Sequence, residues 1–290
     1  MCRQVVGNKK GYMTIDKEYG GLEHYLSWLI FERGGHGNGI IFVKDHQIIK
    51  FKKDIHLSVE EISEALRKMD YDYALFHTRL ASVGSICRSN VHHFVFSPTF
   101  ALAMNGGENC NDLEVRNKRP DMTDAELIAQ SMFESGKHPK EFLDQHTKRS
   151  AYTGIYNGKP YVYTQNKDLM MLLKKKDAFL FSSDFPWQYY GKNIYTIDFD
   201  HALYWEEGME LPTNITETLD ANELINGPYK NDRLLDAIKR NPKYKEIIKR
   251  ILYQLDKEID TAETIYALEK GINQEDIDQN ISIKTLFKLK

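Results

Sequence analysis

The apolar positions of the chain fall into short runs and helical repeats, which together predict a mixture of strands and helices. Short apolar runs predict buried strands at 3–7, 40–43, 73–76, 100–104, 178–182 and 193–199. Between the first two runs, apolar side chains recur at the spacing of one helix face and predict an amphipathic helix over about 20–32. They are Leu22, Tyr25, Leu26, Leu29 and Ile30.

Polar residues mark where further helices begin and where hairpins turn. Residues 58–61 (SVEE) and 123–126 (TDAE) each have the form of a capping box, in which a hydroxyl and an acid three residues later satisfy the first N–H groups of a helix. The second of these helices is expected to run to about Phe133. Asn157-Gly158 lies between two apolar runs and predicts a type I′ hairpin over 154–163. A second hairpin is expected where 47–51 returns along 40–43.

The order of these elements indicates the fold class. Strands and helices are grouped rather than strictly alternating, which favours an α+β fold over a parallel βαβ array. The pattern changes near Leu211-Pro212, because helical spacing of apolar residues then dominates, with charges of both signs between them. We therefore expect one domain over 1–210 and a helical C-terminal extension over 211–290.

Composition excludes several classes of function. The formal net charge is -3, so no global positive field points to nucleic acid. No apolar run is long enough to cross a membrane, and the first residues lack the apolar core of a signal peptide. Three cysteines without a CxxC pair predict neither a disulfide framework nor a metal site, and no motif points to a cofactor. We expect a cytoplasmic protein with reduced thiols.

Cys2 is the first candidate for chemistry. Because cysteine is small, removal of Met1 is expected, which would leave Cys2 with a free α-amino group beside its thiol. An α-amino group has an unperturbed pKa near 8, so one residue could supply both a nucleophile and its base. The alternative is that Cys2 is a small buried residue on the first strand.

Four further stretches line up behind Cys2 in a fixed order. They are 77–84 (HTRLASVG), 90–94 (NVHHF), 104–106 (MNG) and 123–126 (TDAE). In this order they resemble the glutaminase domain of class II glutamine amidotransferases, and the resemblance covers residues 1 to about 205. It implies an N-terminal-nucleophile hydrolase with a four-layer αββα sandwich. The chain also departs from the family pattern. Arg3 stands for a glycine, His36 for an acid, Ser82 for a threonine, His93 for a proline and Met104 for a histidine.

The resemblance assigns the catalytic roles to three residues. It implies that Cys2 is the nucleophile, and that the Asn105 side-chain amide and the Gly106 N–H stabilise the oxyanion of the tetrahedral intermediate. Without the resemblance, 105–107 would be interpreted as a turn.

Substrate recognition is implied for four residues. Arg79 would bind the α-carboxylate of a glutamyl group, Ser82 would add a hydrogen bond to it, and Asp124 would receive the α-ammonium. Arg33 would lie beside the nucleophile. Taken alone, Arg79 could be a surface ion-pair partner and Asp124 a helix-start acid that complements the helix dipole.

We therefore expect an amide hydrolase that takes the small molecule glutamine, releases ammonia and leaves glutamate. Since no acceptor domain is recognisable after about residue 205, the ammonia is expected to serve a partner synthase in trans. Two alternatives stay open, namely a stand-alone hydrolase of another γ-glutamyl amide and a non-catalytic relic that binds a ligand or partner.

Overall fold

A computed structural model describes residues 2–110, 113, 115, 121–165, 170–197 and 202–218, apart from the side chains of Glu32, Arg33 and Trp187. The chain divides into two compact units. Unit 1 comprises Met1–Phe185 and Tyr195–Thr216, and unit 2 comprises Pro186–Ile194 and Glu217–Lys290. The described part of unit 2 includes one short 3-10 helix, η3 (Trp187–Tyr189). The expected helical extension lies outside the described residues beyond position 218, and its described part contains a short strand.

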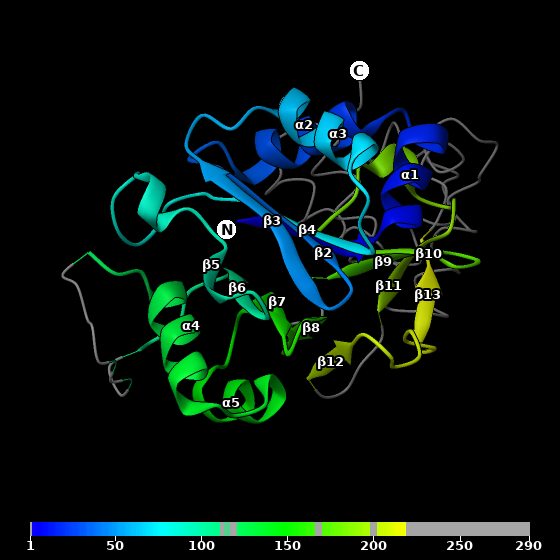
Figure 1. The fold of residues 1–290 in the computed structure, drawn as a ribbon. Coiled ribbons are helices and arrows are strands. Elements are labelled where there is room, and N and C mark those ends of the chain that lie inside the picture. Colours follow the sequence, from blue (N-terminus) through cyan, green and yellow to red (C-terminus); the bar gives the residue numbers. More distant parts are fainter. Residues whose placement is uncertain are drawn as a thin grey trace, which may run out of the picture. The chain divides into compact units, whose positions relative to one another are not determined.

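Two antiparallel sheets form the centre of the fold (Figure 1). The first has the spatial order β13-β11-β9-β10-β1-β4-β2-β3. Its strands are β1 (Arg3–Asn8), β2 (Asn38–Lys44), β3 (Gln47–Asp54), β4 (Tyr73–Thr78), β9 (Met171–Lys175), β10 (Ala178–Ser182), β11 (Ile194–Ile197) and β13 (Ile215–Glu217). The second has the order β12-β8-β7-β6-β5. Its strands are β5 (Phe94–Ser97), β6 (Phe100–Asn105), β7 (Ala151–Tyr156), β8 (Lys159–Thr164) and β12 (Leu203–Glu206).

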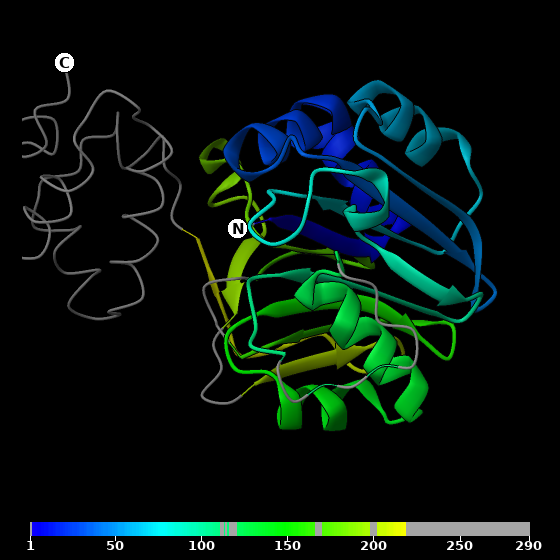
Figure 2. The ribbon, with the colours of Figure 1, turned by 90° about the vertical axis from the view of Figure 1, so that its left-hand side faces the viewer.

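Helices cover the outer faces of both sheets within unit 1. The first sheet is covered by α1 (Lys9–Glu18), α2 (Leu22–Arg33) and α3 (Val59–Lys68), and the second by α4 (Asp124–Ser135) and α5 (Pro139–His146). A short 3-10 turn, η1 (Arg88–Asn90), precedes β5. Figure 2 shows the resulting four layers edge-on, in the order helix, sheet, sheet, helix. The α+β class and the αββα layering expected for 1–210 are thus confirmed within the described part of unit 1.

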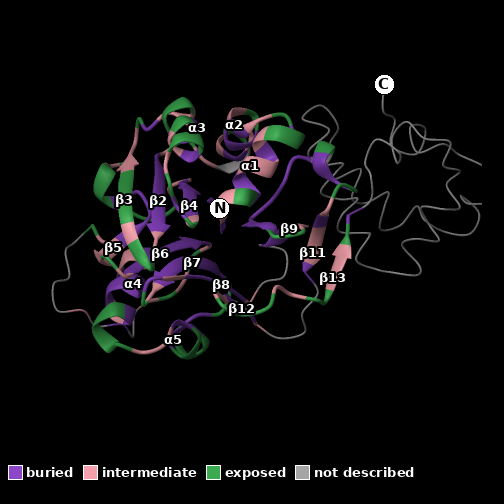
Figure 3. Ribbon diagram, turned by 45° about the vertical axis from the view of Figure 1, so that its right-hand side comes forward, coloured by how far each residue is buried: buried purple, intermediate pink, exposed green. Residues whose placement is uncertain are grey.

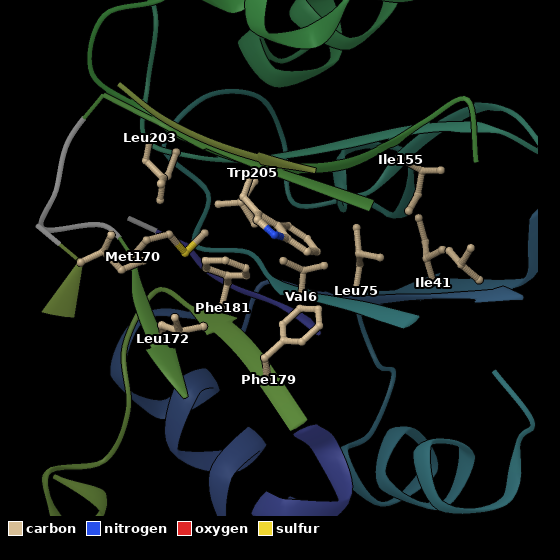
Figure 4. Close-up of a cluster of buried hydrophobic side chains, with 14 of the residues drawn as sticks. Val6, Ile41, Leu75, Ile155, Met170, Leu172, Phe179, Phe181, Leu203 and Trp205 are labelled. Atoms are coloured by element: carbon tan, nitrogen blue, oxygen red, sulfur yellow. The ribbon is translucent and has the colours of Figure 1, made fainter. Parts of the chain in front are cut away.

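An apolar core fills the space between the two sheets. It joins Val6 of β1 and Phe181 of β10 to Trp205 of β12 and Ile155 of β7, and Figure 4 shows these side chains pointing toward one another from the two sheets. A second cluster, which includes Phe100, packs the other face of the second sheet against α4 and α5. Figure 3 shows the central strands as buried and β3 as largely exposed, because β3 is the last strand of its sheet.

The local predictions hold where the sequence pattern is strong. Ser58 and Glu61 form the predicted reciprocal capping box of α3, and Thr123 caps α4 through its hydroxyl. Asn157 and Gly158 have φ of 50° and 78°, the positive values that a type I′ turn requires.

Helix α1 was not expected from the sequence, because it carries few apolar side chains. Its buried face consists of Gly11, Tyr12 and Ile15. A Cβ atom at Gly11 would lie 2.2 Å from the carbonyl oxygen of Phe179, so the glycine lets the helix backbone lie directly on β10. Helix α5 and strands β5, β9 and β12 were likewise absent from the expectations.

The layer between the sheets changes from apolar to polar at one end. Side chains alternate along β1, and Gln4 and Val6 face the second sheet. Gln4 Oε1 accepts a hydrogen bond from Thr153 Oγ1 of β7 at 3.1 Å, whereas Val6 belongs to the apolar core. Cys2 follows the same alternation and therefore stands at the polar end of this layer.

Candidate active site

Strand pairing places Cys2 beside the segment that follows β4. Strands β1 and β4 are antiparallel with Arg3 opposite Thr78, so the residue before β1 meets the residues after β4. The N–H of Leu80 donates to Cys2 Sγ at 3.4 Å, and Sγ lies 3.7 Å from the Leu80 carbonyl oxygen. The side chain is buried, with 7% of the residue exposed.

Burial, a backbone hydrogen bond and nearby charges set the acidity of the Cys2 thiol. Burial is the largest influence and raises its pKa. The Leu80 N–H, the positive charge of the chain's α-amino group and that of Arg79 lower the pKa, whereas the negative charge of Asp124 raises it. The resting thiol is therefore mostly protonated at neutral pH and needs a base before it can attack.

Arg79 is a buried cation held by backbone carbonyl groups. Its Nη1 donates to the Ser85 oxygen at 2.9 Å and its Nη2 to the Val83 oxygen at 2.7 Å. No carboxylate of the described residues lies within ion-pair distance of it, so the alternative of a surface ion pair does not hold. A guanidinium group has five N–H donors, which leaves some of them for an external anion.

The glycine-dense loop after α2 packs against the backbone of this same segment. His36 N–H donates to the Arg79 oxygen at 3.0 Å, and Arg79 N–H donates to the Gly37 oxygen at 2.9 Å. The His36 ring also accepts from the Ala81 N–H through Nδ1 at 2.9 Å. His36 thus positions the chain beside Cys2, a role that the sequence pattern did not reveal.

Two of the expected binding residues are not placed by contacts. Arg33 is the last residue of α2, but its side chain lies outside the described part of the structure. Ser82 is exposed, and its hydroxyl makes no hydrogen bond to another described residue.

Asn105 ends β6 with a buried side chain. Its Nδ2 donates to Ser183 Oγ at 3.3 Å, and Oδ1 has no hydrogen-bond partner among the residues that the structure describes. Ser183 in turn accepts from the Gln4 N–H at 3.0 Å, so one hydroxyl joins the end of the second sheet to β1, two residues from Cys2.

Gly106 must be a glycine for two reasons. Its φ is +142°, a backbone conformation that disfavours side chains, and a Cβ atom there would lie 2.3 Å from Ser150 Oγ. The next residue, Gly107, lies beside Asp124, since a Cβ atom added to the glycine would lie 3.7 Å from the carboxylate atom Oδ2.

Asp124 is connected to this loop by a hydrogen bond. Its Oδ2 accepts from the Glu108 N–H at 3.0 Å, and its Oδ1 accepts from its neighbour Ala125 at 2.9 Å. Burial is the largest influence on the Asp124 carboxyl and raises its pKa. The charges of Arg79 and Asp124 both shift the pKa of the Cys2 thiol, so these three residues lie close enough to interact electrostatically.

Glu108 anchors the loop at its other side, and no sequence signal singled it out. Its Oε1 accepts from the N–H groups of Arg149 and Ser150, each at 2.9 Å. The carboxylate therefore ties the loop after Asn105 to the start of β7.

Within the described ranges, no group of three or more His, Cys, Asp or Glu side chains is arranged to hold a metal ion. No helix among the described residues is long and apolar enough to cross a membrane.

Comparison with known proteins finds similarity only among solved structures. No protein-family model and no curated protein matches the sequence. Glutamine phosphoribosylpyrophosphate amidotransferase from B. subtilis matches with 16% identity and a TM-score of 0.44, over 80% of this chain and 53% of that one. The chain therefore spans about half the length of that enzyme.

Two shorter structures also match. A glutamine aminotransferase class-II domain protein from Silicibacter pomeroyi has 11% identity and a TM-score of 0.37, over 72% of this chain and all of that one. A predicted glutamine amidotransferase from Pseudomonas aeruginosa has 16% identity and a TM-score of 0.33, over 74% of this chain and 89% of that one. All three TM-scores lie below 0.5.

Proposed function

We propose that this protein is an amide hydrolase of the glutamine amidotransferase type, with Cys2 as its nucleophile. The observation that carries the proposal is that the buried Cys2 thiol accepts from the Leu80 N–H at 3.4 Å, directly after the buried cation Arg79. The charges of both Arg79 and Asp124 act on this thiol. A free glutamyl group carries an α-carboxylate and an α-ammonium. The pair of opposite charges around the thiol is complementary to that head group.

Activation of the thiol requires a base, because burial raises the pKa of Cys2. In the proposal, Met1 is removed and the α-amino group of Cys2 accepts the thiol proton. The thiolate then attacks the side-chain amide carbon, and a C–S bond forms as the carbonyl π electrons move to oxygen. The base returns the proton to the amide nitrogen, the C–N bond breaks and ammonia leaves.

Asn105 and Gly106 are proposed to stabilise the negative oxygen of that intermediate. The Asn105 amide nitrogen has two N–H bonds, and one of them is engaged with Ser183. The second N–H and the Gly106 backbone N–H are then available as donors at the polar end of the intersheet layer. Water finally hydrolyses the thioester, which gives glutamate and restores the thiol. We propose that a partner synthase uses the ammonia.

The first test is release of glutamate and ammonium from glutamine. Wild-type protein is expected to release both, and Cys2→Ala to release neither while keeping its melting temperature. Cys87→Ala is the matched control, because it removes a more exposed thiol that the mechanism does not use. An active Cys2→Ala variant would refute the nucleophile. Intact mass shows whether Met1 is absent from the active protein, and full activity with Met1 present would place the base elsewhere.

The second test concerns the head group of the substrate. Truncation of Arg79 to Gln removes a buried partner of the substrate carboxylate, which costs roughly 2–5 kcal/mol. This corresponds to a loss of about thirtyfold to several thousandfold in kcat/KM. Since Arg79 also holds the carbonyl groups of 83–85, the control is Asn90→Ala. Asn90 Nδ2 donates to the same Ser85 oxygen at 3.1 Å but carries no charge. Equal losses in the two variants would assign Arg79 to loop structure alone.

Asp124 is tested with substrates that differ at the α-amine. The wild type is expected to prefer glutamine over N-acetylglutamine, and Asp124→Asn should reduce that preference. Equal turnover of both compounds by the wild type would mean that Asp124 only starts a helix. Activity on larger γ-glutamyl amides but not on glutamine would favour the stand-alone hydrolase. Binding of glutamine without turnover would favour the non-catalytic alternative.

A further inference from the structure

Three histidine rings lie buried between the two sheets, beside the end of β6. His77 belongs to β4, whereas His92 and His93 precede β5. Their residues are 0%, 4% and 0% exposed, and the rings of His77 and His92 lie 4.2 Å apart between centroids. Buried polar rings need hydrogen-bond partners, and two of these three rings bond to the backbone of the same residue.

That shared partner is the backbone of Met104, the residue before Asn105. His77 Nε2 lies 3.2 Å from the Met104 oxygen, and His92 Nδ1 lies 3.3 Å from the Met104 nitrogen. A carbonyl oxygen can only accept and an N–H can only donate, so His77 Nε2 carries a proton and His92 Nδ1 does not. Two different rings therefore hold Met104, one through its backbone N–H and the other through its carbonyl oxygen.

The position of this contact explains why side chains are needed. Strand β5 pairs with β6 up to Phe94 opposite Leu102 on this side. Met104 lies two residues farther along β6, where that ladder has ended. The two imidazoles take the place of the missing strand, and they satisfy backbone groups that would otherwise be buried without partners.

We propose that His77 and His92 are positioning residues that fix the Met104 backbone and thereby aim Asn105 and Gly106 at the reacting carbonyl group. This inference rests on the proposed function, because it assumes that Asn105 and Gly106 stabilise the oxyanion. The two donors follow Met104 directly, so a shift of its backbone moves both. A displacement of about 1 Å at such a site can cost about a hundredfold in rate.

The identity of the bonding nitrogen provides a test that ordinary core packing would not pass. Asn places its amide oxygen on Cγ, as His places Nδ1, whereas Gln places its polar atoms one bond farther, near the position of Nε2. His92→Asn can therefore keep the bond to the Met104 N–H, and His92→Gln is its matched control. At the other ring the order reverses, so His77→Gln can keep the bond to the Met104 oxygen and His77→Asn is the control.

Two measurements are made on all four variants of the full-length chain. The first is the kcat and KM for glutamine. The second is amide hydrogen exchange of Met104 followed by NMR, which does not depend on activity. We expect His92→Gln and His77→Asn to lower kcat by about tenfold to a hundredfold with little change in KM. We expect His92→Asn and His77→Gln to stay within a few-fold of wild type. Exchange at Met104 should rise in His92→Gln but not in His92→Asn.

The outcomes separate this inference from the proposed function. If Asn and Gln behave alike at both positions, in rate and in exchange, the rings only fill space and the inference is wrong. If one pair fails to fold, as judged by thermal melting, the other pair decides the question. If the wild type hydrolyses no amide, the proposed function and the catalytic part of this inference fall together. The exchange at Met104 then shows by itself whether the rings fix the strand.

Discussion

The backbone N–H of Leu80 lies 3.4 Å from the sulfur of Cys2, so the segment after β4 touches the thiol at the start of β1 directly. The same segment carries Arg79 and receives the ring of His36 through the Ala81 N–H. One stretch of backbone therefore links the thiol, the buried cation and the glycine-dense loop. A substitution at any one of these three should therefore alter the positions of the other two.

The thiols of Cys2 and Cys87 should differ in reactivity. Hydrogen bonds from Ser85 and Ser89 lower the pKa of Cys87 to about 7, whereas burial raises the pKa of Cys2. At pH 7, about half of the Cys87 side chains are then thiolate, the form that reacts. Iodoacetamide should alkylate Cys87 at least tenfold faster than Cys2 in the resting protein, as followed by peptide mass spectrometry. Faster labelling of Cys2 would contradict the raised pKa.

Gly106→Ala should destabilise the protein more than Gly136→Ala does. Both glycines have positive φ, at +142° and +64°, but only Gly106 is crowded, by Ser150. The backbone cost at Gly136, which is in the left-handed helical region, is about 1–2 kcal/mol. At Gly106 the φ lies outside that region and disfavours side chains further, and overpacking adds about 1–3 kcal/mol. Urea denaturation measures the difference, and equal losses would show that the loop moves away from Ser150 without strain. If the proposed glutamine hydrolysis is correct, its rate should fall only in Gly106→Ala.

Removal of the Glu108 carboxylate should loosen the loop between Asn105 and Asp124. Glu108→Ala leaves the N–H groups of Arg149 and Ser150 without their acceptor, and their hydrogen exchange should rise. Glu108→Gln keeps one acceptor oxygen and should behave closer to wild type. We expect kcat to fall in the alanine variant by about tenfold, because the proposed oxyanion donors Asn105 and Gly106 precede this loop. Unchanged exchange at 149 and 150 would show that the contact does not hold the loop.

Acid should destabilise the fold through the buried histidines. Burial lowers the pKa of His77 to about 3, helped by the charge of Arg79, and the pKa values of His92 and His93 also lie well below normal, with Lys53 adding to the effect. A group whose folded pKa is depressed stabilises the fold above its unfolded pKa, near 6.5 for histidine, and loses that contribution as the pH falls. For His77 the loss is about 2 kcal/mol at pH 5.

The measurement for this prediction is the free energy of unfolding in urea at pH 7.5 and pH 5. His77→Gln cannot be protonated, so its stability should fall less between the two pH values than that of the wild type. An identical pH dependence of the two proteins would mean that His77 is not the neutral buried ring described above.

Elements with local signals could be predicted from the amino-acid sequence. The helical spacing from Leu22 to Leu29 predicted α2, the hydroxyl–acid pair at Ser58 and Glu61 predicted the start of α3, and Asn157-Gly158 predicted a turn with positive φ. These signals act over a few residues, within reach of one helical turn or one hairpin. The order of the motifs behind Cys2 also led from the sequence to the candidate residues Arg79, Asn105 and Asp124.

The contacts that hold those residues in place could not be predicted, because they join segments far apart in the sequence. The sequence did not predict helix α1. Its Gly11 is required by close contact with the backbone of Phe179, which lies far along the chain. The contact of Leu80 with Cys2 spans 78 residues, and the hydrogen bond between His77 and Met104 spans 27. The raised pKa of the Cys2 thiol, the ring contact of His36 and the anchor at Glu108 likewise depend on burial and on partners brought together by strand pairing. Such partners leave no periodic or compositional trace, because the free energy that selects them comes from contacts between segments distant in the sequence.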